Sequence, residues 1–252
     1  MEAWASTLHA ELVSVFEALF ARLGPEARFE QHGAYAFVSY PRTPVPVFNG
    51  VWSGDDDSAA AAALGRELDR VRATGVSPGV LVRDDDAPGL LGEARRLGLT
   101  QATLVPGMIV APDGFRPAHA EGVEIEIADD AAALSEACEV AAAGFSSPPE
   151  WFRELYGVER STVYLLCAGG RAVSTALSFR GERGVGIFNV ATPEEHRGRG
   201  YGAAVTSRAV ADGLSAGAGF AFLQSSPIGE SVYRSLGFEQ VSSYTIASEP
   251  SG

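Results

Sequence analysis

The fold of this chain is decided by residues 187–205, which read IFNVATPEEHRGRGYGAAV. An apolar run, residues 187–191, leads into a turn at residues 192–195. A loop rich in glycine and arginine follows, and the run that begins at Tyr201 predicts a helix. Strand, glycine-rich turn and helix in this order are typical of a phosphate site. Glycine lets the backbone approach the anion, and the helix N-terminus directs free N–H groups at it.

The spacing of this loop separates it from two better-known phosphate loops. A Walker loop ends in Gly-Lys-Ser/Thr, and no lysine follows here. The dinucleotide fingerprint needs Gly-x-Gly-x-x-Gly, whereas this chain has Gly198-x-Gly200-x-Gly202. The pattern that is present, Arg197-x-x-Gly200-x-Gly202, resembles the pyrophosphate loop of the GNAT family of N-acyltransferases. Taken alone, it also fits a plain strand-to-helix turn.

A second match to the same family lies in residues 226–238, SPIGESVYRSLGF. In the family, a strand ends in a short polar residue, a helix carries a tyrosine seven residues later, and Leu-Gly-Phe closes the motif. Ser226, Tyr233 and residues 236–238 match these positions. The two matches stand in the family's order about thirty residues apart, which is far more specific than either alone. The resemblance is strong over residues 122–247.

The resemblance implies both a fold and a site. The implied fold is α/β (α+β), with helices on both faces of a splayed mixed sheet. The implied acyl donor is acetyl-CoA, whose pantetheine arm would pair with the splayed strand end while Tyr233 protonates the leaving thiolate. The implied cofactor-binding residues are Val190, Ala191, Thr192, Arg197, Gly198, Arg199, Gly200, Tyr201, Gly202, Ala203 and Ser226.

Two implied roles are open at the level of sequence. Ser226 stands where the family most often has asparagine, and a serine before Pro227 is equally well explained as a helix cap. A general base is missing from the matched pattern, because the two splayed strands carry Asn189 and Gln224 where family members often place a glutamate. His196 could titrate near neutral pH, but it directly precedes the phosphate loop.

Two functions of different class are consistent with these residues. The first is an N-acetyltransferase that moves the acetyl group of acetyl-CoA directly to the amine of a small molecule or peptide. The second is a non-catalytic acyl-CoA-binding module with a lost acceptor site. Tyr233 favours the enzyme, and the missing carboxylate favours the binding module. We expect residues 145–152 to cover the acceptor, as the corresponding segment does in the family.

The composition excludes several other classes. The chain has 252 residues, is 46% hydrophobic and carries a net charge of −13, which argues against nucleic acid or an anionic membrane as a partner. No apolar stretch is long enough to span a bilayer, and the first residues do not form a signal peptide. Cys138 and Cys167 show no zinc spacing, so we expect no metal site and reduced thiols in a cytoplasmic protein. A monomer or a homodimer is expected.

The first half of the chain resembles a weaker copy of the second. Phe48-Asn49 matches Phe188-Asn189 at an offset of 140, and Pro88, Leu97 and Gly98 match Pro227, Leu236 and Gly237 at 139. Ala94 replaces the tyrosine, and residues 55–57, three aspartates, replace the loop and would repel a pyrophosphate. The chain thus resembles tandem members of the GNAT family. We predict a degenerate domain at 1–115 without the cofactor loop and a catalytic domain at 122–252.

Overall fold

A computed structural model describes residues 2–54, 57–83 and 88–250. The chain has a mixed α/β fold, and its contacts divide it into two compact units. Unit 1 consists of Met1–Val15 with Met108–Val241, and unit 2 consists of Phe16–Gly107 with Ser242–Gly252. In the part of the chain that is described, no helix combines the length and the apolar character needed to cross a bilayer.

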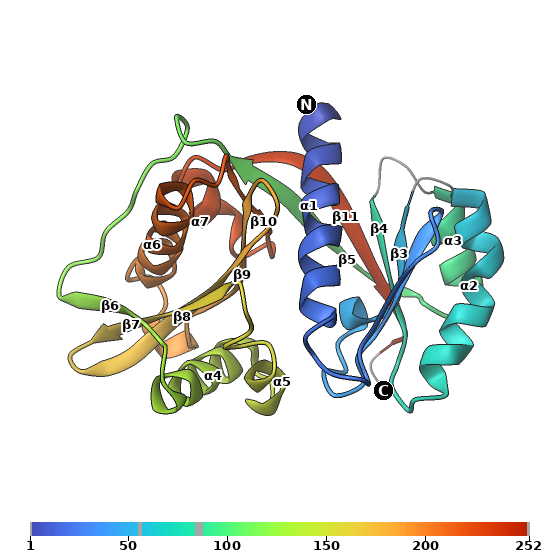
Figure 1. The fold of residues 1–252 in the computed structure, drawn as a ribbon, viewed down its shortest axis with the longest axis horizontal. Coiled ribbons are helices and arrows are strands. Elements are labelled where there is room, and N and C mark those ends of the chain that lie inside the picture. Colours follow the sequence, from blue (N-terminus) through green and yellow to red (C-terminus); the bar gives the residue numbers. More distant parts are fainter. Residues whose placement is uncertain (1, 55–56, 84–87, 251–252) are drawn as a thin grey trace. The chain divides into compact units, whose positions relative to one another are not determined.

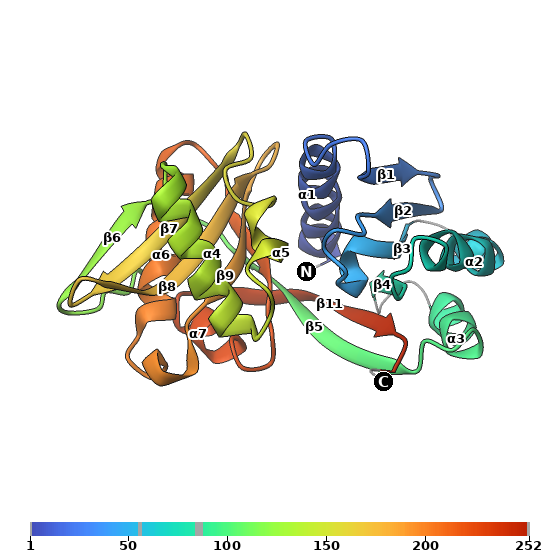
Figure 2. The same cartoon turned by 90° about the horizontal axis from the view of Figure 1, so that it is seen from below.

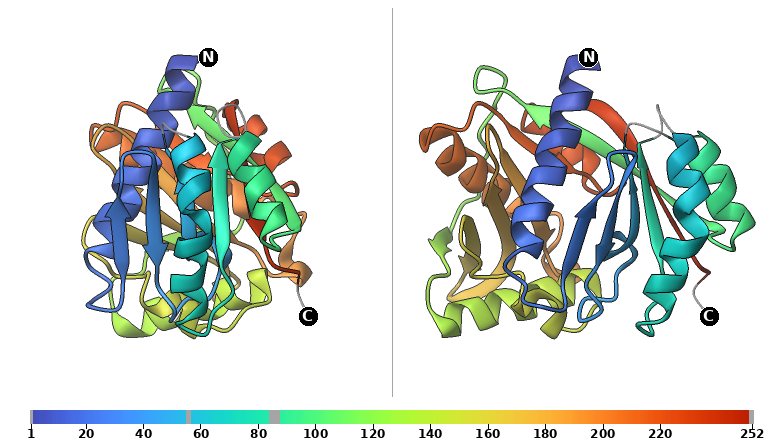
Figure 3. Two further views of the ribbon diagram at one scale, coloured as in Figure 1. Left: turned by 90° about the vertical axis from the view of Figure 1, so that its right-hand side faces the viewer. Right: turned by 45° about the vertical axis from the view of Figure 1, so that its right-hand side comes forward.

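Unit 2 contains a mixed sheet in the order β1-β2-β3-β4-β11. The first three strands are antiparallel neighbours, β3 and β4 are parallel, and β11 returns antiparallel to β4. Helix α2 packs against β2 and β3 (Figure 3). The elements are β1 (Arg28–Gln31), β2 (Tyr35–Ser39), η1 (Pro46–Phe48), β3 (Asn49–Ser53), α2 (Asp57–Arg72), β4 (Gly79–Arg83), α3 (Pro88–Arg96) and the end of β11 (Glu239–Ser248).

Unit 1 contains a mixed sheet in the order β5-β10-β9-β8-β7-β6. Strands β6 to β9 form an antiparallel meander, and β10 pairs parallel to β9 (Figure 1). The elements are the start of α1 (Glu2–Phe20), the end of β5 (Gln101–Val110), β6 (Val123–Ile127), α4 (Ala131–Phe145), α5 (Glu150–Arg153), β7 (Ser161–Ala168), β8 (Arg171–Arg180), β9 (Val185–Ala191), η2 (Glu194–His196), α6 (Tyr201–Ser215), β10 (Ala221–Gln224) and α7 (Glu230–Ser235).

Helices cover both faces of the unit 1 sheet. Helix α6 shares a core with the side chains of β9 and β10 that alternate toward it, among them Ile187 and Leu223. Helix α4 crosses β7, β8 and β9 on the opposite face (Figure 2). The period of two along each strand therefore gives β9 an α6 face and an α4 face.

Two successive stretches of the chain share one order of elements. Strand, strand, helix, strand, helix, strand describes β2 to β5 and also β8 to β11. The helices α3 and α7 both end in Leu-Gly with a left-handed glycine, at Gly98 (φ 98°) and Gly237 (φ 92°). The predicted division at 1–115 and 122–252 is linear, whereas the contacts group the first fifteen residues with unit 1 and residues 242–252 with unit 2.

The first part of the sequence contains a local departure from expectation. The apolar run at residues 47–52 would fit one strand, but Pro46–Phe48 is a 3-10 turn and β3 begins at Asn49. The Phe48 amide donates to the carbonyl of Val45, which closes the turn. Asn49 is fully buried, and its amide binds the backbone of Tyr40, Thr43 and Val45. Its role is to hold the preceding loop.

Asp57 is the described member of the row of three aspartates at residues 55–57. Asp55 and Asp56 lie outside the described residues. The two oxygens of Asp57 accept hydrogen bonds from the N–H groups of Gly89 (2.8 Å) and Leu90 (2.7 Å), in the first turn of α3. A carboxylate at a helix N-terminus is favoured by the free N–H groups and by the helix dipole. The negative charge therefore stabilises α3 from the start of α2.

Candidate functional site

The glycine-rich loop lies at the N-terminus of α6, as its sequence predicts. Gly198 (φ 76°) and Gly200 (φ 78°) are left-handed, and Gly200 is the residue before the helix. The first bond of the helix joins the Ala204 N–H to the Gly200 carbonyl at 2.9 Å. The N–H groups of Tyr201, Gly202 and Ala203 precede that bond and have no partner among the described residues. Three unpaired donors at a helix start form a site for an anion.

The two loop arginines hold the loop in shape. Arg197 donates from Nε to the Thr192 carbonyl (3.0 Å) and from Nη2 to the Gly144 carbonyl (3.1 Å). Arg199 donates to the Glu195 carbonyl at 3.4 Å. Both side chains are exposed, so their positive charge still reaches an anion bound nearby. The sequence indicated their charge but not their bonds to the backbone.

Strands β9 and β10 pair at their first residues, Ala221 with Val185 and Phe222 with Gly186. Beyond these pairs the two strands form no further register among the described residues. Further along β9, Asn189 is left-handed (φ 48°), and the pairing with β8 shifts so that three residues of β9 span two of β8. This is a β-bulge, which turns backbone groups out of the ladder. It places Val190 and Ala191 at the opening, where the pantetheine arm is expected to pair.

Ser174 and Gly144, which the sequence analysis did not single out, fix the end of β9. The Ser174 hydroxyl is fully buried and donates to the Ala191 carbonyl at 2.9 Å, and it lies 2.9 Å from the Thr192 hydroxyl. A Cβ added to Gly144 would lie 2.8 Å from the Cβ of Ala191, so only glycine fits at that position in α4. Neither residue belongs to a known pattern, so only the folded contacts identify them.

Tyr233 lies on α7, half-buried, with its ring packed against the core of unit 1. Its ring meets Phe238 edge to face at 5.9 Å. Burial raises the pKa of the Tyr233 hydroxyl to about 12. The hydroxyl makes no hydrogen bond to a described residue, so it can donate to a bound group. A Cβ at Gly229 would lie 2.9 Å from the ring, which makes Gly229 a requirement for this placement.

Ser226 bonds to the turn that precedes α7 and not to the helix itself, whose N-cap is Gly229. Its exposed hydroxyl accepts a hydrogen bond from the Gly229 N–H at 3.2 Å, in the turn before α7. Ser225, which precedes it, is fully buried and donates to the Ser226 carbonyl at 2.7 Å. Ser226 thus holds the turn before α7 without being the helix cap, and a ligand role for Ser226 stays a prediction.

Two polar side chains near the opening contain buried nitrogens without hydrogen-bond partners among the described residues. These atoms are Nε2 of Gln224, at the end of β10, and Nδ1 of His196, in η2. Glu194 and Glu195 lie in the same 3-10 turn as His196, and both of their side chains are exposed. The side chains of Asn189 and Gln224 do not titrate, so the strand ends supply no base.

The segment predicted to cover the acceptor begins at the last residue of α4. Its first residue, Phe145, follows the close contact of Gly144 with Ala191. The Phe145 ring is 47% exposed and stacks on Phe152 at 5.8 Å. Phe152 is itself buried, and Trp151 is half-buried. An exposed ring on a buried one leaves an apolar surface beside the opening.

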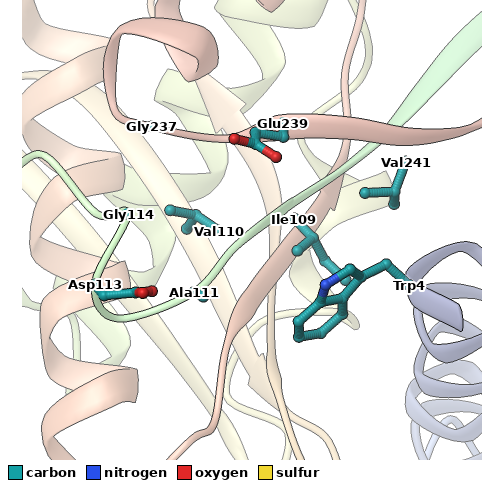
Figure 4. Close-up of a pocket in the computed structure, with 9 residues that line it drawn as sticks. All are labelled: Trp4, Ile109, Val110, Ala111, Asp113, Gly114, Gly237, Glu239 and Val241. Atoms are coloured by element: carbon teal, nitrogen blue, oxygen red, sulfur yellow. The ribbon is translucent and has the colours of Figure 1, made fainter. Parts of the chain in front are cut away.

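A separate cavity of about 270 Å³ lies in unit 1 away from these residues (Figure 4). Hydrophobic side chains line it together with two carboxylates, Asp113 and Glu239, and the indole of Trp4. It contains none of the predicted site residues. Within the described ranges, no three His, Cys, Asp or Glu residues are grouped closely enough to hold a metal ion.

Comparison with solved structures identifies the fold. The chain is similar to a GCN5-related N-acetyltransferase from Kribbella flavida, with a TM-score of 0.72 and 18% identity over 95% of this chain and 96% of that one. It is similar to a functionally unknown conserved protein from Staphylococcus epidermidis ATCC 12228, with a TM-score of 0.67 and 12% identity over 92% of this chain and 98% of that one. It is also similar to a GCN5-related N-acetyltransferase from Sphaerobacter thermophilus, with a TM-score of 0.60 and 15% identity over 87% of this chain and 81% of that one.

These likenesses establish the fold alone, which is that of the GNAT acetyltransferases. No family model and no curated protein matches the chain.

Proposed function

We propose that this chain is an acyl-CoA-dependent N-acyltransferase that moves the acetyl group of acetyl-CoA to the amine of a small molecule or peptide. One observation carries the proposal. In a fold shared with GNAT acetyltransferases, three unpaired N–H groups at the start of α6 follow a bulged strand that has separated from its neighbour. The first feature suits a pyrophosphate, and the second suits an extended arm that ends in a thioester.

The residues present fit acetyl-CoA as the acyl donor. The N–H groups of Tyr201, Gly202 and Ala203 would hold the pyrophosphate, with Arg197 and Arg199 adding positive charge. The backbone at Val190 and the following residues would pair with the pantetheine amides. Donors at the bulge would stabilise the negative charge that develops on the thioester oxygen.

Direct transfer needs one bond made and one broken. The amine nitrogen attacks the thioester carbonyl carbon, and the carbon–sulfur bond then breaks. The departing thiolate takes a proton from the Tyr233 hydroxyl, whose raised pKa keeps it protonated at neutral pH. The amine loses a proton, and the phenolate of Tyr233 regains one, directly or through water. An ammonium ion has no lone pair with which to attack, and Asn189 and Gln224 cannot deprotonate it, so the amine must reach the site neutral.

The test is thiol release from acetyl-CoA against a panel of amines. The proposal predicts release above the hydrolysis background with at least one amine, together with the acetylated amine by mass spectrometry. If acetyl-CoA binds but no amine on a broad panel is acetylated, the chain is a binding module instead. The panel should include small alkylamines, amino acid amides and short peptides, since the acceptor class is the open variable.

A further inference from the structure

Gln224 faces the side of the sheet opposite to α6. The side chains of β9 and β10 that pack into the α6 core are Val185, Ile187, Ala221 and Leu223. Alternation along the strands turns Phe188, Phe222 and Gln224 to the α4 face. The rings of Phe188 and Phe222 confirm this, because they meet edge to face at 6.1 Å. The Gln224 side chain therefore lies on the sheet face opposite to the α6 core.

The Gln224 amide is unsatisfied in the folded protein. Its Nε2 is buried and has no hydrogen-bond partner among the described residues. Its Oε1 has no such partner either. A buried donor without an acceptor typically costs about 1–3 kcal/mol. A cost of that size at the end of a strand is removed when a ligand brings an acceptor atom to the amide.

Two aromatic side chains share the strand face of Gln224. Phe188 and Phe222 form one wall, and α4 ends beside β9 at the contact of Gly144 with Ala191. Gln224 is the polar residue of β10, whose other residues are Ala221, Phe222 and Leu223. Its amide is therefore the group of this strand that can orient an acceptor by a hydrogen bond.

We propose that Gln224 selects the acceptor by donating from Nε2 to an oxygen that the acceptor carries within a few bonds of its amine. Neighbouring strands lie about 5 Å apart where they pair, and Gln224 is two residues beyond the last paired residue, Phe222. An amine placed against a thioester at β9 therefore reaches Gln224 with a nearby carbonyl or hydroxyl. The preferred class is amino amides, peptide N-termini and amino alcohols, over simple alkylamines. The inference rests on the proposed function.

Matched pairs of amines test this selection. Leucinamide is compared with 3-methylbutylamine, phenylalaninamide with 2-phenylethylamine, and ethanolamine with ethylamine. Each pair gives a ratio of kcat/KM for the oxygen-bearing amine over its partner, measured in the parent and in Gln224→Leu. Comparing the ratio between the two proteins cancels the different basicities of the amines. Gln101→Leu, at an exposed glutamine, is the matched control.

The expected result is that Gln224→Leu lowers the ratio roughly five- to tenfold, the effect of one neutral hydrogen bond. The rate with the simple alkylamine should stay within about twofold, and Gln101→Leu should leave every ratio unchanged. Gln224→Leu should unfold at the same or a higher temperature, because the amide it removes has no partner. An equal ratio in the parent and Gln224→Leu would overturn the assignment.

Calorimetry separates this inference from the proposed function. Leucinamide is titrated into the parent and into Gln224→Leu, each saturated with coenzyme A. If no amine is acetylated but leucinamide binds the parent and binds Gln224→Leu more weakly, the proposed function fails and the selection by Gln224 stands. If amines are acetylated with no preference for the oxygen-bearing member, the function stands and the selection fails. Absence of both acetylation and binding overturns both.

Discussion

Tyr233 is the residue on which the proposed chemistry depends most. Its ring packs against the apolar core of unit 1, and burial raises its pKa to about 12. No described residue receives a hydrogen bond from it, so the proton is available to a departing group. The sequence predicted this position from its seven-residue distance to Ser226. The sequence did not indicate the lack of a partner, because that depends on side chains packed around the hydroxyl.

Replacing Tyr233 by phenylalanine keeps the ring and removes the proton. We predict that Tyr233→Phe lowers the turnover number roughly 10²- to 10⁴-fold, the range for a positioned general acid. Affinity for acetyl-CoA should change by less than about 1 kcal/mol, since only one neutral hydrogen bond is lost. The measurement is steady-state kinetics with the best amine, beside calorimetry with acetyl-CoA. Turnover at the parent rate, with chemistry rate-limiting, would make Tyr233 a packing residue.

The pH dependence of turnover follows from the same pKa. A raised pKa keeps the acid protonated up to about pH 12, so Tyr233 should cause no loss of rate at lower pH. The amine must lose its proton before attack, so the rate should rise with pH and level off above the pKa of the acceptor. Tyr233→Phe should lower the plateau without moving the midpoint. A falling alkaline limb well below pH 12 that disappears in Tyr233→Phe would contradict this account.

At the scale of elements, Gly200 and Gly202 are glycines for different physical reasons. Gly200 is left-handed, so any side chain there is strained by roughly 1–2 kcal/mol before a ligand is considered. Gly202 lies inside the first turn of α6, and a Cβ there would meet only Thr192 Oγ1 at 3.6 Å. The protein alone therefore tolerates a side chain at Gly202, and the ligand is the remaining reason for a glycine.

Gly202→Val is accordingly the informative variant of this loop. We predict that it abolishes acetyl-CoA binding, because the side chain stands between the N–H groups and the pyrophosphate. Its thermal unfolding should match or exceed that of the parent, since glycine is a poor helix former. The control is Gly92→Val in α3, another helical glycine with no neighbour within 4 Å, which should bind normally. Parent-like affinity in folded Gly202→Val would remove the phosphate site.

The N-terminus of α3 depends on a bond that the sequence did not reveal. Asp57 was predicted only as part of an acidic row, yet its carboxylate binds two N–H groups of α3. We predict that Asp57→Ala lowers the free energy of unfolding by about 1 kcal/mol, within the range of 0.5–2 for a lost cap. Acetyl-CoA affinity should not change. Asp69→Ala, on the exposed face of α2, is the control for charge, and an equal loss there would refute the cap.

Local motifs predicted the elements of unit 1 well, and pairing between distant segments accounts for what they missed. The loop, the helix after it and the meander each follow from a few neighbouring residues. The bulge at Asn189 depends on register against β8, and the tie from Ser174 to Ala191 joins residues 17 apart in the chain. Such contacts leave no recognisable pattern in the sequence, since many residue types would serve equally well at either end.

At the scale of the whole molecule, two units of like element order differ in chemistry. Unit 1 has the glycine loop, the bulge and Tyr233, whereas unit 2 has Asp57 at the start of α2 and Ala94 at the position of the tyrosine. The sequence does not predict that β5 and β11 each begin in one unit and end in the other, because each has the sequence of a single strand. We propose that unit 2 is a degenerate copy that keeps the fold without the donor site.

The central claim is that the loop before α6 is the single acyl-donor site of the chain. Calorimetric titration with acetyl-CoA tests it most directly, in the parent and in Gly202→Val. The account predicts one acetyl-CoA per chain in the parent and none in the folded variant. Two molecules per chain would contradict the degenerate copy, and one molecule that still binds folded Gly202→Val would place the donor site elsewhere.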